Sequence, residues 1–154
     1  MSRLTAGDAA PPFELAADDG ELVSSSALAG SRYVLYFYPK DDTPGCTTQA
    51  CGLRDSWSRV ADTGVEVFGV SPDSVKSHAK FRAKYGLPYR LLADAGHELA
   101  EAYGVWIQKK LMGREYMGVE RSTFVVGAEG RIQAVLPQVK PSEHVDQLLE
   151  ALAA

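Results

Sequence analysis

The chain has 154 residues, of which 45% are hydrophobic and 23% are charged, and its formal net charge is −4. This size predicts a single domain, residues 1–154, with a sizeable buried core. The negative charge argues against general nucleic-acid binding, and no apolar stretch reaches the roughly 18 residues of a membrane span. The first residues lack the apolar core of a signal peptide, so a cytoplasmic location is expected.

The N-terminal part of the chain predicts a hairpin followed by a short helix. Two short segments, 13–15 and 21–23, flank the turn signal Asp-Asp-Gly at 18–20, which is typical of a β-hairpin. Three serines at 24–26 offer caps for a short helix around Leu28.

The next two elements are a buried strand and a long helix. Residues 33–38 are apolar without interruption, as expected for a strand covered on both faces. From about Pro44 to Ala61, apolar residues recur with helical spacing and form one narrow stripe. The stripe consists of Cys46, Ala50, Leu53, Trp57 and Val60.

The rest of the chain alternates between strands and helices and ends with a hairpin and a helix. Residues 108–118 are expected to form a loop. Strands are expected at 65–70, 89–93, 122–126 and 132–136, and helices at 71–85, at 97–103 and from Ser142 onward. This order predicts an α/β fold with helices around a mixed sheet.

The chain has only two cysteines, Cys46 and Cys51. Cys46 falls where the buried strand ends and the helix begins, and the unpaired N–H groups and dipole of a helix N-terminus favour the reactive thiolate. In a reducing compartment a cysteine pair is more often catalytic or metal-binding than structural. The position therefore indicates cysteine redox chemistry, although a buried structural thiol would also fit an apolar stripe.

A longer motif surrounds the first cysteine. Pro39, Thr43 and Cys46 match the peroxiredoxin active-site motif Pro-x-x-x-Thr-x-x-Cys, and the string 38–51 resembles the bacterioferritin comigratory protein (PrxQ-type) subfamily. A second patch, residues 118–124, is similar to the peroxiredoxin segment that carries the active-site arginine. The resemblance extends over nearly the whole chain. It implies a thioredoxin-like fold, in which helices flank a central mixed sheet and an N-terminal hairpin is added.

The resemblance also implies a thiol peroxidase that reduces hydrogen peroxide and alkyl hydroperoxides. Cys46 would attack the O–O bond, Thr43 would offer its hydroxyl to the peroxide, and Pro39 would shield the thiolate from water. Arg121 would favour the thiolate and bind a peroxide oxygen, whereas its spacing alone would equally allow a solvated surface charge. Gln49 stands where many relatives carry Glu.

Cys51 is the resolving cysteine that the resemblance implies. On an ideal helix two residues five apart are separated by about 8.6 Å and about 140° of rotation, whereas a disulfide tolerates at most about 7 Å between Cα atoms. If the pair is catalytic, the first helical turns must therefore unwind after Cys46 is oxidised. The alternative is a bystander thiol on the outer helix face. An in-chain resolving cysteine makes a monomer sufficient, and a thioredoxin-like dithiol protein would recycle it.

The remaining polar residues give weaker signals. His78, His97 and His144 show no ligand spacing and are expected at the surface, so no zinc site is predicted, and no haem or flavin is implied. Asp41 and Asp42 are expected to form a solvated loop tip.

Two other functions would use the same cysteines. A redox-sensing or chaperone-like protein could use the disulfide as a switch without rapid turnover. A thioredoxin-like reductase is disfavoured, because its motif is C-x-x-C and the spacing here is C-x₄-C.

Overall fold

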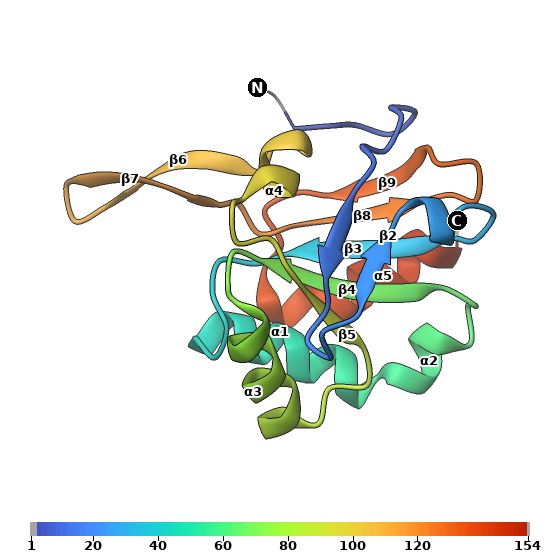
Figure 1. The fold of residues 1–154 in the computed structure, drawn as a ribbon, viewed down its shortest axis with the longest axis horizontal. Helices are drawn as coiled ribbons and strands as arrows, with labels where there is room; N and C mark the ends of the chain where they lie inside the picture. Colours follow the sequence, from blue (N-terminus) through green and yellow to red (C-terminus); the bar gives the residue numbers. More distant parts are fainter. Residues whose placement is uncertain (1–2, 154) are drawn as a thin grey trace.

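A computed structural model describes residues 3–153 (Figure 1). Its centre is a five-stranded sheet with the strand order β5-β4-β3-β8-β9. β3 pairs in parallel with β4, and β4 with β5, whereas the β3–β8 and β8–β9 pairs are antiparallel. The predicted mixed sheet is therefore confirmed. The strands are Tyr33–Phe37 (β3), Glu66–Ser71 (β4), Arg90–Ala93 (β5), Ser122–Val126 (β8) and Ile132–Leu136 (β9).

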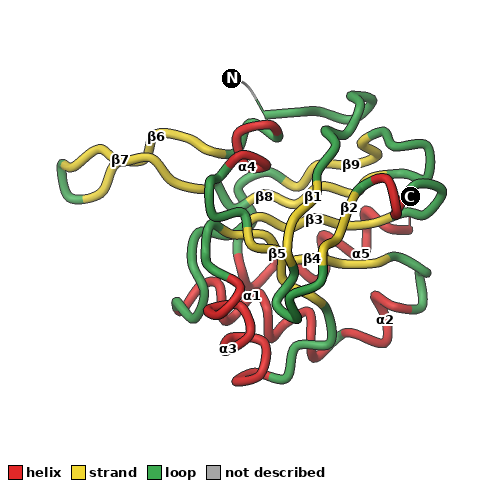
Figure 2. The backbone as a smooth tube through the Cα atoms, in the orientation of Figure 1, coloured by secondary structure: helices red, strands yellow, loops and turns green. Residues whose placement is uncertain are grey.

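β3 lies in the middle of this sheet, and all its residues are buried. Because successive side chains point to opposite faces, Leu35 and Phe37 enter one core and Val34 and Tyr36 enter the other. The helices α1, α2, α3 and α5 pack on the Val34 face, and α4 and the N-terminal hairpin cover the opposite face (Figure 2). The helices are Pro44–Asp55 (α1), Trp57–Ala61 (α2), Val75–Tyr85 (α3), Glu98–Ala102 (α4) and His144–Ala153 (α5).

The N-terminal hairpin predicted from the sequence is present. Its strands are Glu14–Ala16 (β1) and Leu22–Ser24 (β2), and they pair antiparallel. The turn includes Gly20, whose φ of 84° is readily adopted by glycine. A 3₁₀ turn, Ser26–Leu28, follows where the short helix was expected.

The long helix predicted for residues 44–61 is broken, so that prediction was wrong in one respect. α1 ends at Asp55, and Ser56 adopts φ −108° and ψ 18° before α2 begins at Trp57. The N–H of Arg59 bonds to the Ser56 carbonyl, which is the tighter i→i+3 pattern. The apolar spacing continues across the break, and it therefore gave no sign of it.

The loop expected at residues 108–118 is instead a second hairpin. Its strands, Trp106–Leu111 (β6) and Arg114–Val119 (β7), pair antiparallel and project away from the main sheet (Figure 1). The turn residues Met112 and Gly113 both have positive φ, of 52° and 81°, as a two-residue hairpin turn requires. Much of the hairpin is exposed on both faces, so its sequence lacks the alternating pattern of a half-buried strand.

The other helix boundaries follow the local sequence signals. The Ser74 side chain accepts a hydrogen bond from the Ser77 N–H at the start of α3, and Gly86 ends that helix with φ 60°. At the C-terminus a 3₁₀ turn, Pro141–Glu143, precedes α5, which begins two residues after the expected Ser142. Among residues 3–153, no helix has the length and apolar character needed to cross a membrane.

Candidate active site

Cys46 is the third residue of α1, and only 1% of it is exposed. A short loop connects the end of β3 to this helix. Thr43 precedes the first helical residue in an extended conformation, and Pro44 occupies the first helical position, where a missing N–H leaves no helical hydrogen bond unmade. The predicted strand-to-helix junction at Cys46 is confirmed. Both cysteines carry free thiols.

Arg121 lies beside this thiol although it is 75 residues further along the chain. Its Nη1 donates to Cys46 Sγ at 3.3 Å and to Gln49 Oε1 at 2.7 Å. Gly45 gives the guanidinium its room, because a Cβ at that position would lie 3.1 Å from Arg121 Nη2. Arg121 is therefore not a freely solvated surface charge.

Gln49 and His144 fill the space behind the guanidinium, and both are fully buried. Gln49 Nε2 lies 3.1 Å from His144 Nδ1, and His144 Nε2 lies 2.8 Å from Thr123 Oγ1. Burial and the positive charge of Arg121 lower the pKa of His144 to about 3, so the ring is neutral near pH 7. The prediction of a surface His144 was wrong, because the first turn of α5 faces inward.

Thr43 and Pro39 are half-buried residues of the loop that leads to α1. The Thr43 hydroxyl donates its hydrogen to the Lys40 carbonyl at 2.9 Å. Its oxygen lone pairs therefore remain available to accept a hydrogen bond.

Cys51 is half-buried and lies on a different side of α1 from Cys46. The helix is continuous from Pro44 to Asp55, so the ideal separation of about 8.6 Å between the two Cα atoms applies. That separation exceeds the reach of a disulfide. Next to Cys51, the Ala50 carbonyl accepts a hydrogen bond from Tyr89 at 3.2 Å, which ties the middle of α1 to the residue just before β5.

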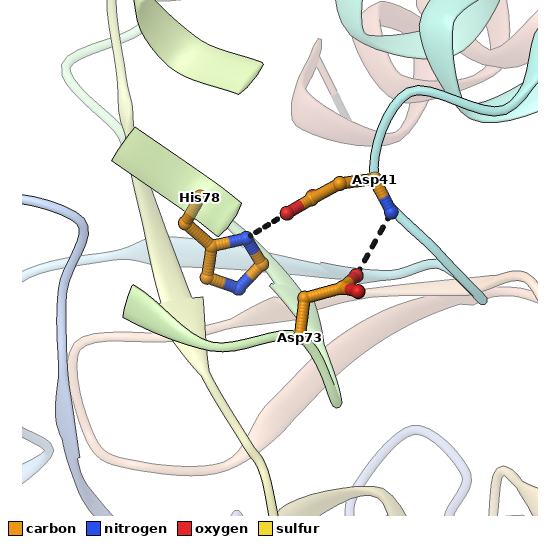
Figure 3. A group of neighbouring side chains, drawn as sticks. All are labelled: Asp41, Asp73 and His78. Carbon is orange, nitrogen blue, oxygen red and sulfur yellow. Dashed lines mark hydrogen bonds and ion pairs between the residues drawn. The ribbon is translucent and has the colours of Figure 1, made fainter. Parts of the chain in front are cut away.

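The loop before α1 is also held from the opposite side, by a cluster of Asp41, Asp73 and His78 (Figure 3). Asp41 Oδ2 lies 2.8 Å from His78 Nδ1, and the Asp41 N–H donates to Asp73 Oδ2 at 2.8 Å. Asp41 also accepts from Tyr38 and Ser77, at 2.6 and 2.7 Å. These partners fix the orientation of the Asp41 carboxylate. The bonds to Ser77 and His78 hold the loop against α3.

Two predictions are wrong for this cluster. Asp41 and His78 were expected in solvent, but they are 8% and 0% exposed, and of the presumed loop tip only Asp42 is exposed. Burial of these polar groups is compatible with stability because each is hydrogen-bonded. His97, the third histidine, is half-buried, and its ring stacks on Trp106 at 3.9 Å.

The family of the chain follows from its similarity to known proteins. Residues 6–135 match the model of the AhpC/TSA family. The chain is 51% identical over 146 residues to the peroxiredoxin Bcp of Bacillus subtilis, covering 95% of this chain and 93% of that one. It is 49% identical to a putative peroxiredoxin bcp of Coxiella burnetii, with coverage of 95% and 97%.

Solved structures agree with these relatives. A PrxQ mutant of Xylella fastidiosa superposes with a TM-score of 0.92 at 33% identity and covers 99% of this chain and 98% of its own. The bacterioferritin comigratory protein of Xanthomonas campestris, studied for alkyl peroxide reduction, has a TM-score of 0.86 at 38% identity, with coverage of 92% and 90%.

The chain belongs to the AhpC/TSA family, as a peroxiredoxin of the bacterioferritin comigratory (PrxQ) type. The thioredoxin-like fold and the thiol peroxidase activity that the sequence motif implied are thereby confirmed.

Two histidines of this peroxiredoxin that were expected at the surface, His78 and His144, are buried. A periodic signal was present for both of them. His78 lies three residues before the buried Phe81 on α3, and His144 lies four residues before the buried Leu148 on α5. Those spacings place each ring on the inward face of its helix. The lack of metal-ligand spacing therefore did not justify placing them in solvent.

Proposed function

We propose that Cys46 is the peroxidatic cysteine and that its contact with Arg121 carries the reaction. The thiolate sulfur attacks the terminal peroxide oxygen, the O–O bond breaks, and the second oxygen leaves with the electron pair. The sulfur becomes a sulfenic acid, and the leaving oxygen takes up a proton to form water or an alcohol. The 3.3 Å contact between Arg121 Nη1 and Cys46 Sγ supports this proposal, because a fixed guanidinium stabilises both the thiolate and the departing oxygen.

Thr43 and Pro39 complete the proposed substrate site. The Thr43 oxygen, whose hydrogen is donated to Lys40, accepts a hydrogen bond from the peroxide O–H. First-turn N–H groups of α1 face the developing negative charge. Pro39 adds an apolar wall without an N–H donor and keeps water away from the thiolate.

Cys51 is proposed as the resolving cysteine. Its thiol sulfur attacks the sulfenic sulfur of Cys46, water leaves, and an intramolecular disulfide forms. Since the intact helix keeps the two residues about 8.6 Å apart, the first turns of α1 unwind before this bond forms.

The proposed cycle closes with an external dithiol. A thioredoxin-like protein reduces the disulfide, and the substrates are hydrogen peroxide and alkyl hydroperoxides, the latter class being named for the Xanthomonas relative. Because both cysteines belong to one chain, a monomer is sufficient. We infer one domain over residues 1–154 that works in the cytoplasm, where thioredoxin systems keep such pairs reduced.

A coupled assay with thioredoxin, thioredoxin reductase and hydrogen peroxide tests the proposal. Cys46→Ser should abolish turnover, because a serine hydroxyl is not a useful nucleophile at neutral pH. Folding of the variant is checked by circular dichroism. Substantial peroxidase activity in the folded variant would contradict the role of Cys46.

Cys51→Ser separates the two cysteines. This variant should consume one equivalent of peroxide and yield a sulfenic acid that dimedone traps, but it should not turn over with thioredoxin. Turnover at the wild-type rate would make Cys51 a bystander. Slow turnover by the wild-type protein itself would instead favour a redox sensor that uses the same disulfide.

A further inference from the structure

A chain of hydrogen bonds links the Cys46 site to the C-terminal helix. It runs from Arg121 through Gln49 on α1 and His144 on α5 to Thr123 on β8, with separations of 2.7, 3.1 and 2.8 Å. Gln49, His144 and Thr123 are each fully buried. Arg121 and Thr123 are two residues apart in the sequence, so the same segment supplies both ends. We call this set of four residues the relay.

The donors and acceptors of the relay fit together in only one way. A guanidinium can only donate, so Gln49 must present its oxygen to Arg121 and its NH₂ to His144. His144 Nδ1 must then accept and carries no hydrogen. The ring hydrogen is on Nε2, which donates to Thr123 Oγ1.

His144 therefore determines which way the Gln49 amide points. Without an acceptor at Nδ1, the Gln49 NH₂ group would be buried with no partner, which costs about 1–3 kcal/mol. An amide turned by 180° would place NH₂ against the guanidinium, where two donors would face each other. The neutral ring is the form the relay needs, and the buried position beside Arg121 favours it.

We propose that His144 is a positioning residue for the peroxidase reaction, which orients Gln49 so that Gln49 in turn aims Arg121 at Cys46. This inference rests on the proposed roles of Cys46 and Arg121. His144 does not touch the reacting sulfur, and it acts through two intervening side chains. The competing explanation is that the ring only fills space, since it also packs 5.6 Å from the Tyr36 ring.

Two substitutions separate positioning from packing. His144→Phe keeps an aromatic ring but removes both nitrogens, and it should lower kcat/KM for peroxide about tenfold, the worth of one buried hydrogen bond. His144→Asn places an oxygen close to the former Nδ1 position, so it should recover most of that loss. Equal rates for the wild type and both folded variants would overturn the proposal.

A more distant substitution tests the direction of the relay. Thr123→Val is nearly isosteric and removes the acceptor for the ring Nε2–H, which allows the ring hydrogen to move to Nδ1 and oppose the Gln49 NH₂. It should slow peroxide reduction about threefold, less than a full hydrogen bond. An unchanged rate in Thr123→Val would show that the ring's hydrogen is not fixed from β8, and the proposal would fail.

The rate of Cys46 alkylation by iodoacetamide across pH provides a readout that loss of stability alone would not move. His144→Phe should shift this profile toward higher pH, and His144→Asn should restore it. Leu152→Val, a core change in α5 outside the relay, is the matched control and should lower stability without moving the profile. A shift of the same size in Leu152→Val would assign the effect to packing and overturn the proposal.

The proposed function is tested separately in the same series through Cys46→Ser. If that variant keeps its activity, the peroxidase assignment of Cys46 fails whatever the His144 variants do. If it is inactive while His144→Phe matches the wild type in rate and profile, only the positioning role fails.

Discussion

The guanidinium of Arg121 serves two acceptors through one nitrogen. Nη1 donates to Cys46 Sγ and to Gln49 Oε1, and the planar fork leaves Nη2 close to Gly45. A lysine at this position would supply the charge but not the fixed fork of donors. The charge and the geometry of Arg121 can therefore be separated by substitution.

Arg121→Lys should keep much of the Cys46 alkylation rate at pH 7 and still reduce peroxide at least about tenfold more slowly. Arg121→Ala should lower both rates, because the thiolate loses its positive neighbour. Stopped-flow peroxide reduction and iodoacetamide alkylation measure the two effects. Arg114→Ala, an exposed arginine on the β6–β7 hairpin, is the control. Equal peroxide rates in Arg121→Lys and wild type would exclude a role for the fork.

The residues proposed to react could be chosen from the sequence because each stands in a local motif. Cys46 follows Pro39 and Thr43 at fixed spacing, and a second string surrounds Arg121. The partners of His144 are of another kind, because Gln49 is 95 residues away and Thr123 is 21 residues away. Only the packing of α1 and α5 on the sheet brings these three together, and no single-sequence pattern encodes that contact.

At the scale of elements, α1 carries both cysteines of the proposed reaction and is also the element that the proposed disulfide requires to move. Its middle is anchored by the Tyr89 hydroxyl, which donates to the Ala50 carbonyl and is bonded to the Tyr36 hydroxyl at 2.8 Å. The neighbouring residue Gln49 anchors the same part of the helix through the relay. Both anchors lie between the two cysteines and have to release before the disulfide forms.

Amide hydrogen exchange should show this release. In the oxidised protein, amides from about Thr43 to Leu53 should exchange faster than in the dithiol form, because the helical hydrogen bonds there are lost. β3, which keeps its ladder in both states, serves as the internal reference. Equal protection of residues 43–53 in both redox states would contradict a Cys46–Cys51 disulfide.

Helix ends were predictable where a local residue sets them, as Ser74 and Gly86 do for α3. The break at Ser56 was not, because apolar spacing is continuous through it. The β6–β7 hairpin was missed for the opposite reason. Its strands bury no regular face, so their only signal was the turn at Met112 and Gly113.

For the whole molecule, the alternation of strands and helices predicted a mixed sheet but not its strand order. The turn at 127–130 made β8 and β9 neighbours from sequence alone. The pairing of β3 with β8 joins segments far apart in the chain, and nothing local selects it. That pairing is what brings Arg121, the residue just before β8, beside the end of β3.

The buried ring of His144 gives the stability of the molecule a defined dependence on pH. Its pKa is about 3 in the folded protein, against 6.5 for an unperturbed histidine. Between these values the unfolded chain binds a proton that the folded protein does not, so stability falls as the pH falls. From pH 7 to pH 5 this group alone should remove about 2 kcal/mol.

Urea unfolding at pH 7 and pH 5 checks this value. His144→Phe should lose about 2 kcal/mol less than the wild type over that interval, because it lacks the group that titrates. Thr123→Val keeps the histidine and should keep the wild-type difference. Equal losses in the wild type and His144→Phe would show that the ring is not held neutral.

The break at Ser56 also bears on how fast α1 can re-form after the proposed disulfide is reduced. Because α1 is a separate helix of 12 residues, the part of the chain that the proposed cycle unwinds and re-forms is short, and Val60 of α2, which packs in the core, lies outside it. A peptide helix of about 20 residues relaxes in about 0.1–1 μs, whereas enzymes commonly turn over about 1–1,000 times per second. Once the disulfide is reduced, re-formation of α1 is therefore much faster than one turnover and does not limit the rate of the proposed cycle. The rate is limited instead by the chemical steps or by binding of the reductant.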